Sequence, residues 1–394
     1  MRRSRWLTLV CMATTAASLV LGGGQLLVDR QIRLRSLVTA DPPPAPVMVR
    51  VAGHRLAITG ALVRAVQSDH LTLWAWAPTP TIHVRKPGGP APVTIDVENL
   101  PRRMQLEASG PVEESSHGPI RTLRVLPQVT PTLTFIDSRH EVTFAVLGDT
   151  GDSDTFAEAL CLAASQGADF LLHTGDLIYR DEQIPHLETM LATAPLPVFL
   201  VRGNHDYRNA RRLQMMRELA PPYYTFHLGA LTVIILDNGT DYVPTLWSRS
   251  TQYRWLRALF AIPREGPLVV AMHMPPFDRQ TPTRPKAMRD RAFAQQLMRD
   301  FSQAGVAAVF TGHIHASYRW DRDGIPYVIS GEGHHTPTTL HHMAWVQVRG
   351  EDVHIQLRPI EPQTQHQEQA AGLPWICLAH SSYPRTGIHQ VRRE

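Results

Sequence analysis

Residues Gly312-His313-Ile314-His315 are the last of five short polar segments around which this chain is organised. Each segment follows a short apolar run, and such runs predict strands that end where the polar residues begin. In open α/β sheets, ligands collect at the carboxyl ends of the strands. The sequence therefore predicts one site built by five loops. The four segments upstream are Gly148-Asp149-Thr150-Gly151, Gly175-Asp176-Leu177-Ile178-Tyr179, Gly203-Asn204-His205-Asp206 and Val270-Ala271-Met272-His273.

The side chains in these segments are carboxylates, an amide, imidazoles and one phenol, without a thiolate. Oxygen and nitrogen donors of this kind suit Fe, Zn or Mn. Two cations held about 3.5–4 Å apart need a shared anionic ligand that offsets their repulsion. The metal ligands that we predict are Asp149, Tyr179 and His315 for one ion, Asn204, His273 and His313 for the other, and Asp176 as the bridge.

Tyr179 indicates which metal lies on its side of the site. A free phenol has a pKa of about 10, and it ionises readily only beside a strong Lewis acid. We therefore expect Fe(III) next to Tyr179 and a divalent ion (Fe, Zn or Mn) in the other position.

In this order, the segments resemble the purple acid phosphatase branch of the calcineurin-like metallophosphoesterases over residues 142–330. The wider superfamily has a histidine two residues after the first aspartate. Here Gly151 takes that place and Tyr179 compensates, as in the purple acid branch. The resemblance implies two mixed β-sheets flanked by helices, with the metals at the sheet edge. It also implies that a metal-bound hydroxide attacks the phosphoryl group while His205 donates a hydrogen bond to a phosphoryl or leaving oxygen.

One part of the family pattern is missing. Plant-type members carry a histidine pair shortly after the fourth segment, and one of the two helps to protonate the leaving group. Residues 274–278 contain no histidine. His334 and His335 follow a predicted strand from the same region, but we interpret both as surface residues.

The composition is that of a folded protein without a strongly charged partner. The chain has 394 residues, enough for two domains, with 43% hydrophobic and 19% charged residues. Its formal net charge is +4, and no dense basic block of the kind that follows a nucleic-acid backbone is present. We therefore expect no nucleic-acid binding, and the small phosphorylated substrate that we expect is what the family resemblance implies.

Residues 1–30 read as a signal peptide or a membrane anchor. Three arginines lie within the first five residues, and residues 6–28 follow without a charge. That run is long enough to cross a bilayer, and it also fits a secretory signal. We expect an exported, periplasmic or extracytoplasmic protein, and we leave open whether the segment is removed or retained as an anchor.

The cysteines are Cys11, Cys161 and Cys377. Cys161 falls on a predicted buried helix, and nothing in the sequence pairs it with Cys377. We interpret both as ordinary thiols.

Four further segments divide the chain. Residues 31–46 are a proline-rich linker, which is stiff and extended. Residues 47–138 contain short apolar or alternating runs separated by Pro, Gly and Ser, which predict a small all-β, sandwich-like domain. Residues 139–360 alternate strands with helices, which predicts a layered α/β domain. Its helices are expected at 155–166, 182–192, 208–218, 252–260 and 285–304, and residues 361–394 form a polar tail.

The favoured hypothesis is an exported dimetal phosphomonoesterase of the acid phosphatase type. One alternative is a phosphodiesterase or nucleotidase of the same fold, since the pocket walls rather than the metals decide the substrate. The other is a non-catalytic envelope protein that binds a partner through its all-β domain and carries structural metals.

Overall fold

The computed structural model describes residues 46–86, 91–117, 119–127, 129–239, 251–280, 286–333, 340–360 and Cys377. The predicted signal or anchor, nearly all of the linker, the polar tail apart from Cys377, and both His334 and His335 lie outside these residues. Within the described part of the chain, no helix has the length and apolar character needed to span a membrane.

The strands before residue 138 form two five-stranded sheets. Burial in these strands alternates with period two, as at Val93, Ile95 and Val97, whose side chains are buried while those between them are half-buried. This alternation is the pattern of strands with one face in a core. The first sheet contains, in spatial order, β1 (Val47–Val51), β2 (His54–Thr59), β5 (Thr81–Lys86), β10 (Thr132–Ile136) and β7 (Gln105–Ala108). The second contains β3 (Ala61–Val66), β4 (His70–Ala75), β6 (Val93–Glu98), β9 (Ile120–Val125) and β8 (Val112–His117).

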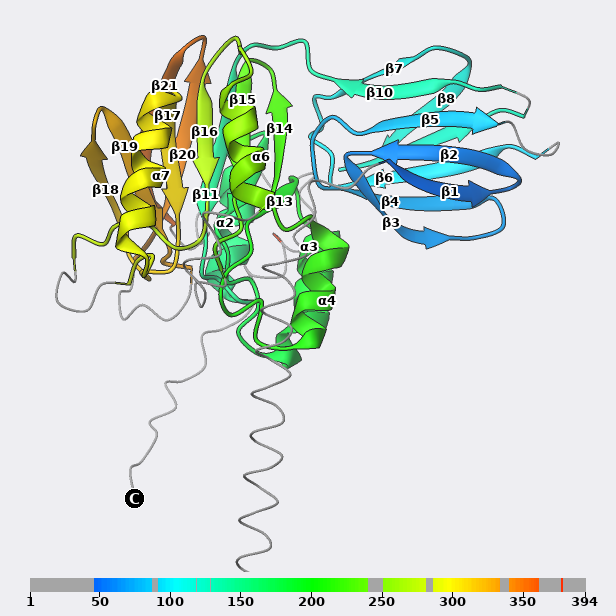
Figure 1. Ribbon diagram of the computed structural model, residues 1–394. Helices are drawn as coiled ribbons and strands as arrows, with labels where there is room; N and C mark the ends of the chain where they lie inside the picture. The colour runs from blue at the N-terminus through cyan, green and yellow to red at the C-terminus, as the bar shows by residue number, and fades with distance from the viewer. Residues whose placement is uncertain are drawn as a thin grey trace, which may run out of the picture.

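Two mixed sheets form the rest of the described chain, beside the all-β part (Figure 1). The predicted α/β fold of two mixed sheets with flanking helices is confirmed. The first sheet has the order β13 (Val198–Leu200), β12 (Phe170–His173), β11 (Val142–Leu147), β20 (His341–Arg349) and β21 (Asp352–Ile360). The second has the order β14 (Tyr224–Leu228), β15 (Leu231–Ile235), β16 (Leu268–Ala271), β17 (Val306–Thr311), β19 (Ile325–Ser330) and β18 (Ser317–Arg322).

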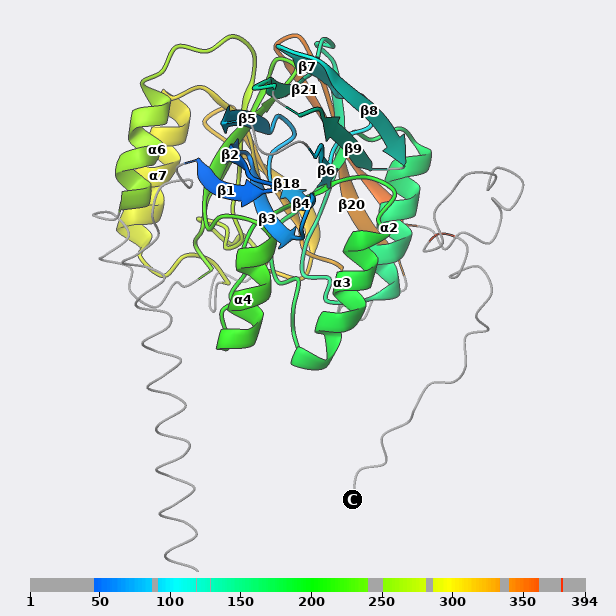
Figure 2. The same cartoon turned by 90° about the vertical axis from the view of Figure 1, so that its right-hand side faces the viewer.

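Helices cover both outer sides of these sheets. Figure 2 shows α6 (Thr251–Phe260) and α7 (Arg291–Gln303) on one side, and α2 (Asp154–Ser165) and α3 (Ile184–Ala192) on the other. The short helix η1 (Asp181–Gln183) leads into α3, and α4 (Ala210–Leu219) follows the third polar segment. Side-chain caps fix where α2, α4 and α7 begin, because Ser153, Asn209 and Asp290 each accept a hydrogen bond from the backbone N–H three residues ahead.

The observed elements differ from the predicted ones in two places. The helix expected over residues 285–304 begins only at Arg291, because Asp290 caps it and the residues before it form a loop. Strand β14 was not predicted. It is the edge strand of its sheet and pairs antiparallel with β15, and its buried side chains Tyr224, Phe226 and Leu228 alternate with less buried ones.

The all-β part is joined to the α/β part by specific polar contacts. Asn99 donates through Nδ2 to the carbonyls of Ala75 (2.8 Å) and Val198 (3.1 Å), and its Oδ1 accepts from the Val198 N–H (2.8 Å). The amide thus pairs with the edge strand β13 as a neighbouring strand would. Arg103 adds ion pairs to Asp137 and, at 2.8 Å, to Asp169.

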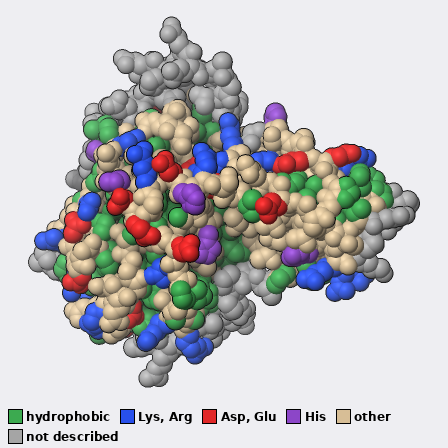
Figure 3. Space-filling view, turned by 90° about the horizontal axis from the view of Figure 1, so that it is seen from above, with side chains coloured by type: hydrophobic (Ala, Val, Ile, Leu, Met, Phe, Trp, Pro, Cys, Tyr) green, Lys and Arg blue, Asp and Glu red, His purple; other side chains and the backbone are tan. Residues whose placement is uncertain are grey.

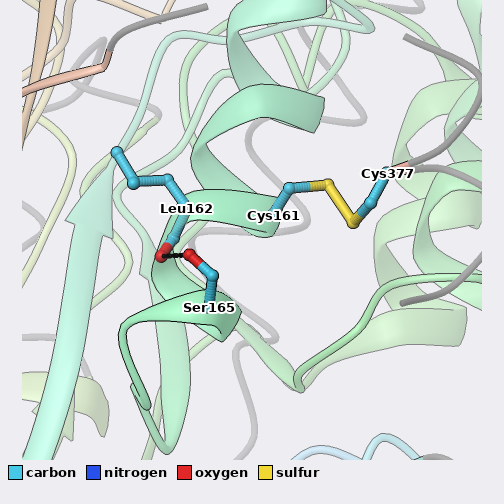
Figure 4. The surroundings of a disulfide bond; sticks show 4 residues. All are labelled: Cys161, Leu162, Ser165 and Cys377. Atoms are coloured by element: carbon cyan, nitrogen blue, oxygen red, sulfur yellow. Dashed lines mark hydrogen bonds between the residues drawn. A yellow bond between two sulfur atoms is a disulfide. The ribbon is translucent and has the colours of Figure 1, made fainter. Parts of the chain in front are cut away.

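Our interpretation of Cys161 and Cys377 as free thiols was wrong. The two residues form a disulfide with a Cα–Cα distance of 5.6 Å (Figure 4). Both are buried, and 216 positions separate them in the sequence. The pairing joins α2 to a residue far along the chain, and cysteine spacing does not reveal which residues meet in space.

Charges of both signs are mixed on the surface. On the face shown in Figure 3, lysine and arginine side chains are interspersed with aspartate and glutamate. Ion pairs among the exposed side chains of the described residues include Arg319 with Asp321 (2.7 Å). Such pairs contribute little to stability, so the stability of the fold depends mainly on the buried residues of its sheets and helices.

Candidate metal centre

The predicted ligands lie in loops that leave the carboxyl ends of five neighbouring strands. Strand β11 leads to Asp149, β12 to Asp176 and β13 to Asn204, while β16 and β17 of the other sheet lead to His273 and to His313 and His315. Strands β11, β12 and β13 run parallel to one another, as do β16 and β17, so within each sheet these loops leave the same edge. The two edges come together at the seam between the sheets, which places all six side chains in one site.

Two groups of potential ligands share Asp176. The first contains Asp176, His273 and His313, and the second contains Asp149, Asp176 and His315; within each group the ligand atoms all lie within 4.8 Å of one another. This is the division between two ions, with Asp176 between them, that the sequence predicts. The structure thus offers two adjacent positions for metal ions rather than one.

The remaining two predicted ligands lie beside these groups. Oδ1 of Asn204 is 3.1 Å from Nε2 of His273, which puts the amide oxygen on the His273 side. The Tyr179 hydroxyl is 3.3 Å from Nε2 of His315, which puts the phenol on the other side. The structure therefore brings all seven predicted ligands together.

The loop backbones are strained where they carry ligands. Asp149, Asp176, His313 and His315 have φ values of 58°, 55°, 69° and 54°, in the left-handed region that side chains other than glycine rarely adopt. Strain of this kind persists only where the surroundings enforce it, and it concentrates at functional sites. Close approach also requires glycine: a Cβ on Gly312 would lie 2.4 Å from Oδ2 of Asp149.

Hydrogen bonds orient the ligands. Asp149 accepts through Oδ2 from the His313 N–H (2.8 Å), and Asp176 accepts through Oδ1 from the His205 N–H (2.7 Å). Nδ1 of His273 lies 2.9 Å from the Thr174 carbonyl. A carbonyl only accepts, so Nδ1 carries the proton and Nε2 is left to face the other ligands. Partners of this kind fix the tautomer of metal-binding histidines.

The pKa values reflect carboxylates and imidazoles that are buried together. Burial raises the pKa of Asp149 well above its usual range. Burial alone would lower the pKa of His273, but Asp176 and Asp149 raise it to about 10. Burial, with the nearby charge of His273, lowers the pKa of His313 to about 3.

These features fit two cations. Oδ1 of Asp149 is buried and accepts no hydrogen bond from the residues that the structure describes, and Nε2 of His315 lies 3.5 Å from it. The high pKa of His273 means that, without a metal, a proton supplies the positive charge that the two buried aspartates require. The donor set of carboxylates, imidazoles, an amide and a phenol suits borderline transition metals. A cation in each group would satisfy both requirements.

His205 lies at the side of the centre that Tyr179 occupies. The two rings are 4.5 Å apart at an interplanar angle of 49°, and His205 is only half-buried. Burial lowers its pKa, and Asp176 offsets this in part. Its backbone is fixed by Asp176, while its ring has access to solvent, so it can contact a bound molecule without being a metal ligand.

The sequence did not single out several supporting residues. Asn238 follows strand β15 and holds the His273 loop: Oδ1 accepts from the N–H groups of His273 and Met274 (both 3.0 Å), and Nδ2 donates to the Met274 carbonyl (2.7 Å). Glu332 accepts from the N–H groups of Ser317 and His342 (both 3.1 Å). Asn238, like the predicted ligands, is a polar residue that comes shortly after a strand. A search for polar residues after every predicted strand would therefore have identified Asn238.

Comparisons with known proteins agree with this geometry. The family model described as calcineurin-like phosphoesterase matches residues 142–317. The chain is 29% identical over 230 residues to purple acid phosphatase 21 of Arabidopsis thaliana, covering 50% of this chain and 51% of that protein. It is 28% identical over 182 residues to the serine/threonine-protein phosphatase CPPED1 of Danio rerio, covering 41% and 58%. It is 27% identical over 217 residues to a probable cyclic nucleotide phosphodiesterase of Rhodococcus erythropolis, covering 52% and 71%.

The chain thus spans about half the length of the plant purple acid phosphatase that it matches. The family predicted from the five polar segments is the one whose model matches residues 142–317, and the purple acid phosphatase relatives support that branch.

Proposed function

We propose that this chain, whose residues 142–317 form a calcineurin-like phosphoesterase domain, hydrolyses phosphomonoesters of small molecules with two bound metal ions. The observation that carries the proposal is the pair of ligand groups that share Asp176. A single structural metal would need one group, whereas two adjacent positions joined by a carboxylate suit phosphoester hydrolysis.

Asp149, Tyr179 and His315 would hold one ion, Asn204, His273 and His313 the other, and Asp176 both. When bound, the ions supply Lewis acidity that neutralises charge on the phosphoryl oxygens and lowers the pKa of water. The protein holds the ligands in a fixed arrangement before substrate arrives, so little reorganisation accompanies the reaction. His205 would donate a hydrogen bond from its half-exposed ring to a phosphoryl or leaving oxygen.

Tyr179 supports Fe(III) as the ion on its side. Burial raises the pKa of the phenol, and Asp149 and Asp176 raise it further. Only a strongly acidic cation would ionise such a phenol near neutral pH. The other position has an amide and two imidazoles besides Asp176, which suits a divalent Fe, Zn or Mn ion.

A phosphodiesterase is the second candidate, because a probable cyclic nucleotide phosphodiesterase is among the relatives and is covered to 71% of its length. Hydrolysis of p-nitrophenyl phosphate and of bis-p-nitrophenyl phosphate by the metal-loaded protein would separate the two. Preference for the monoester supports our proposal, and preference for the diester supports the alternative. If neither ester were hydrolysed at any pH between 4 and 9, the hypothesis of a non-catalytic binding protein would be supported instead.

Export to an oxidising compartment is part of the proposal. The Cys161–Cys377 disulfide is of a kind that persists outside the reducing cytosol, and residues 6–28 carry no charge. The full chain fused at its C-terminus to a reporter that is active only after export would test this. An inactive reporter together with a reduced Cys161 would contradict it.

A further inference from the structure

Asp206 lies fully buried beneath the candidate metal centre, and none of the predicted ligand groups includes it. Its carboxylate faces backbone N–H groups. Oδ2 accepts from Gly203 (2.8 Å) and from Asp176 (3.1 Å), and Oδ1 accepts from Ile178 (2.9 Å). All three donors belong to two loops, one that carries the bridging aspartate and one that carries Asn204.

The backbones of these two loops are in close contact. A Cβ on Gly203 would lie 2.2 Å from the backbone nitrogen of Asp176 and 2.2 Å from its Oδ1. Asp176 itself has a left-handed backbone with φ of 55°, which is unfavourable for an aspartate without support. The contact therefore needs a group that holds both backbones in place, and the Asp206 carboxylate contacts both.

The other ligands have separate supports. The Tyr179 N–H donates to Oε1 of Gln183 (2.8 Å). His313 is tied to Asp149 through its N–H. His273 is held by Asn238. The hydrogen bonds that Asp206 accepts come from Gly203, Asp176 and Ile178 and not from these supports, so its removal affects Asp176 and Asn204 first.

We infer that Asp206 is a positioning residue that fastens the bridging Asp176 and the outer ligand Asn204 into one rigid unit, so that its loss weakens binding of the ion on the Asn204 side. This inference rests on the two-metal site proposed above. A carboxylate is suited to the task because it only accepts hydrogen bonds, and three donors face it.

The Asp206→Asn variant tests the inference with little change in volume. Whichever way the amide is oriented, its NH₂ group faces at least one backbone N–H, so one or two of the three hydrogen bonds are lost. Loss of such supporting partners typically weakens metal binding about 10- to 100-fold. We expect a weakening in this range for the second ion, with the first ion held nearly as in the wild type.

The matched control is Asp300→Asn. Asp300 is also a buried carboxylate, and it accepts from the Tyr253 hydroxyl (2.6 Å) and from Gln296 (2.8 Å). It lies on α7 and contacts none of the ligand loops through these bonds. A general effect of losing a buried carboxylate would appear in both variants, whereas a positioning effect appears only at Asp206.

The readouts are metal content and the coupling between the ions, measured on full-length protein loaded with Mn²⁺. Chelator competition gives the two affinities, and electron paramagnetic resonance distinguishes an exchange-coupled Mn pair from isolated ions. We expect a coupled pair in the wild type and in Asp300→Asn, and isolated Mn²⁺ in Asp206→Asn at the same Mn²⁺ concentration. Unfolding curves establish that each variant is folded.

If Asp206→Asn does not fold, Asp206→Glu replaces it, because it keeps the charge but displaces the acceptor atoms by one methylene; the same loss of coupling is expected. A folded variant that binds both ions within twofold of wild-type affinity and retains the coupled spectrum would overturn the inference alone. Wild-type protein that never binds two ions would overturn the proposed function, and the inference with it.

Discussion

His173 should make the stability of this protein fall as the pH falls below neutrality. The imidazole lies at the end of β12 with no exposed surface. Its Nδ1 accepts from the Gly175 N–H (3.3 Å), so the proton is on Nε2, which donates to the Thr150 hydroxyl (2.9 Å). That hydroxyl in turn donates to the Gly151 carbonyl (2.9 Å). If Nδ1 were also protonated, its N–H would face the Gly175 N–H in a buried site, and neither donor would have an acceptor there.

The magnitude follows from the pKa values of the folded and unfolded states. Burial lowers the pKa of His173 to about 3 in the folded protein, from 6.5 when exposed. Because the folded pKa is the lower one, the unfolded chain binds the proton first, and folding becomes less favourable as the pH falls through 6.5 towards 3. Between pH 7 and pH 5 the linkage relation gives a loss of about 2 kcal/mol.

The assay is chemical unfolding of the metal-free wild type and the His173→Gln variant at pH 7 and pH 5. Glutamine does not titrate, so the wild type should lose about 2 kcal/mol more than the variant between the two pH values. The control is His140→Gln, which makes the same substitution at an exposed histidine. Equal losses in the wild type and in His173→Gln would refute the reasoning.

Three further perturbations test separate parts of the structure. Tyr179→Phe should abolish the visible charge-transfer band of the iron-loaded protein; an unchanged spectrum would mean that the phenol binds no iron. Asn99→Ala should lower the free energy of unfolding by about 1–3 kcal/mol, because it leaves the N–H and C=O of Val198 unpaired at a buried edge; denaturant titration measures this, and no loss would contradict the role of the amide. Peptide mapping without reductant should find Cys161 linked to Cys377, and Cys161→Ser should lower stability by up to about 5 kcal/mol for a loop closed over 216 residues; free thiols on both residues would be the opposite result.

The candidate ligands could be predicted because their signal is local. Each lies within a few residues of a strand end, and strand ends in an α/β sheet share an edge. Asp176, for example, comes three residues after the strand Phe170–His173 ends. The order of these segments along the chain, rather than any one of them, carried the prediction of both the fold and the two-metal site.

Features that depend on distant segments were not predictable in this way. The partner of Cys161 is 216 positions away, and Asn99 contacts a strand 99 positions downstream. The polarity of Asp206 was visible in the sequence, but only the structure shows that its carboxylate faces two ligand loops. Sequence patterns report what lies next to a residue in the chain, whereas these roles depend on what lies next to it in space.

The central claim is that loops distant in the chain converge to hold two cations joined by Asp176. The most direct measurement is the metal content of purified wild-type protein and of Asp176→Asn, determined by elemental analysis after removal of loosely bound ions. We expect about two metal ions per chain in the wild type and a loss of both the pair and hydrolysis in the variant. A wild type that retains fewer than two ions, or an Asp176→Asn variant that keeps both and hydrolyses phosphoesters normally, would contradict the claim.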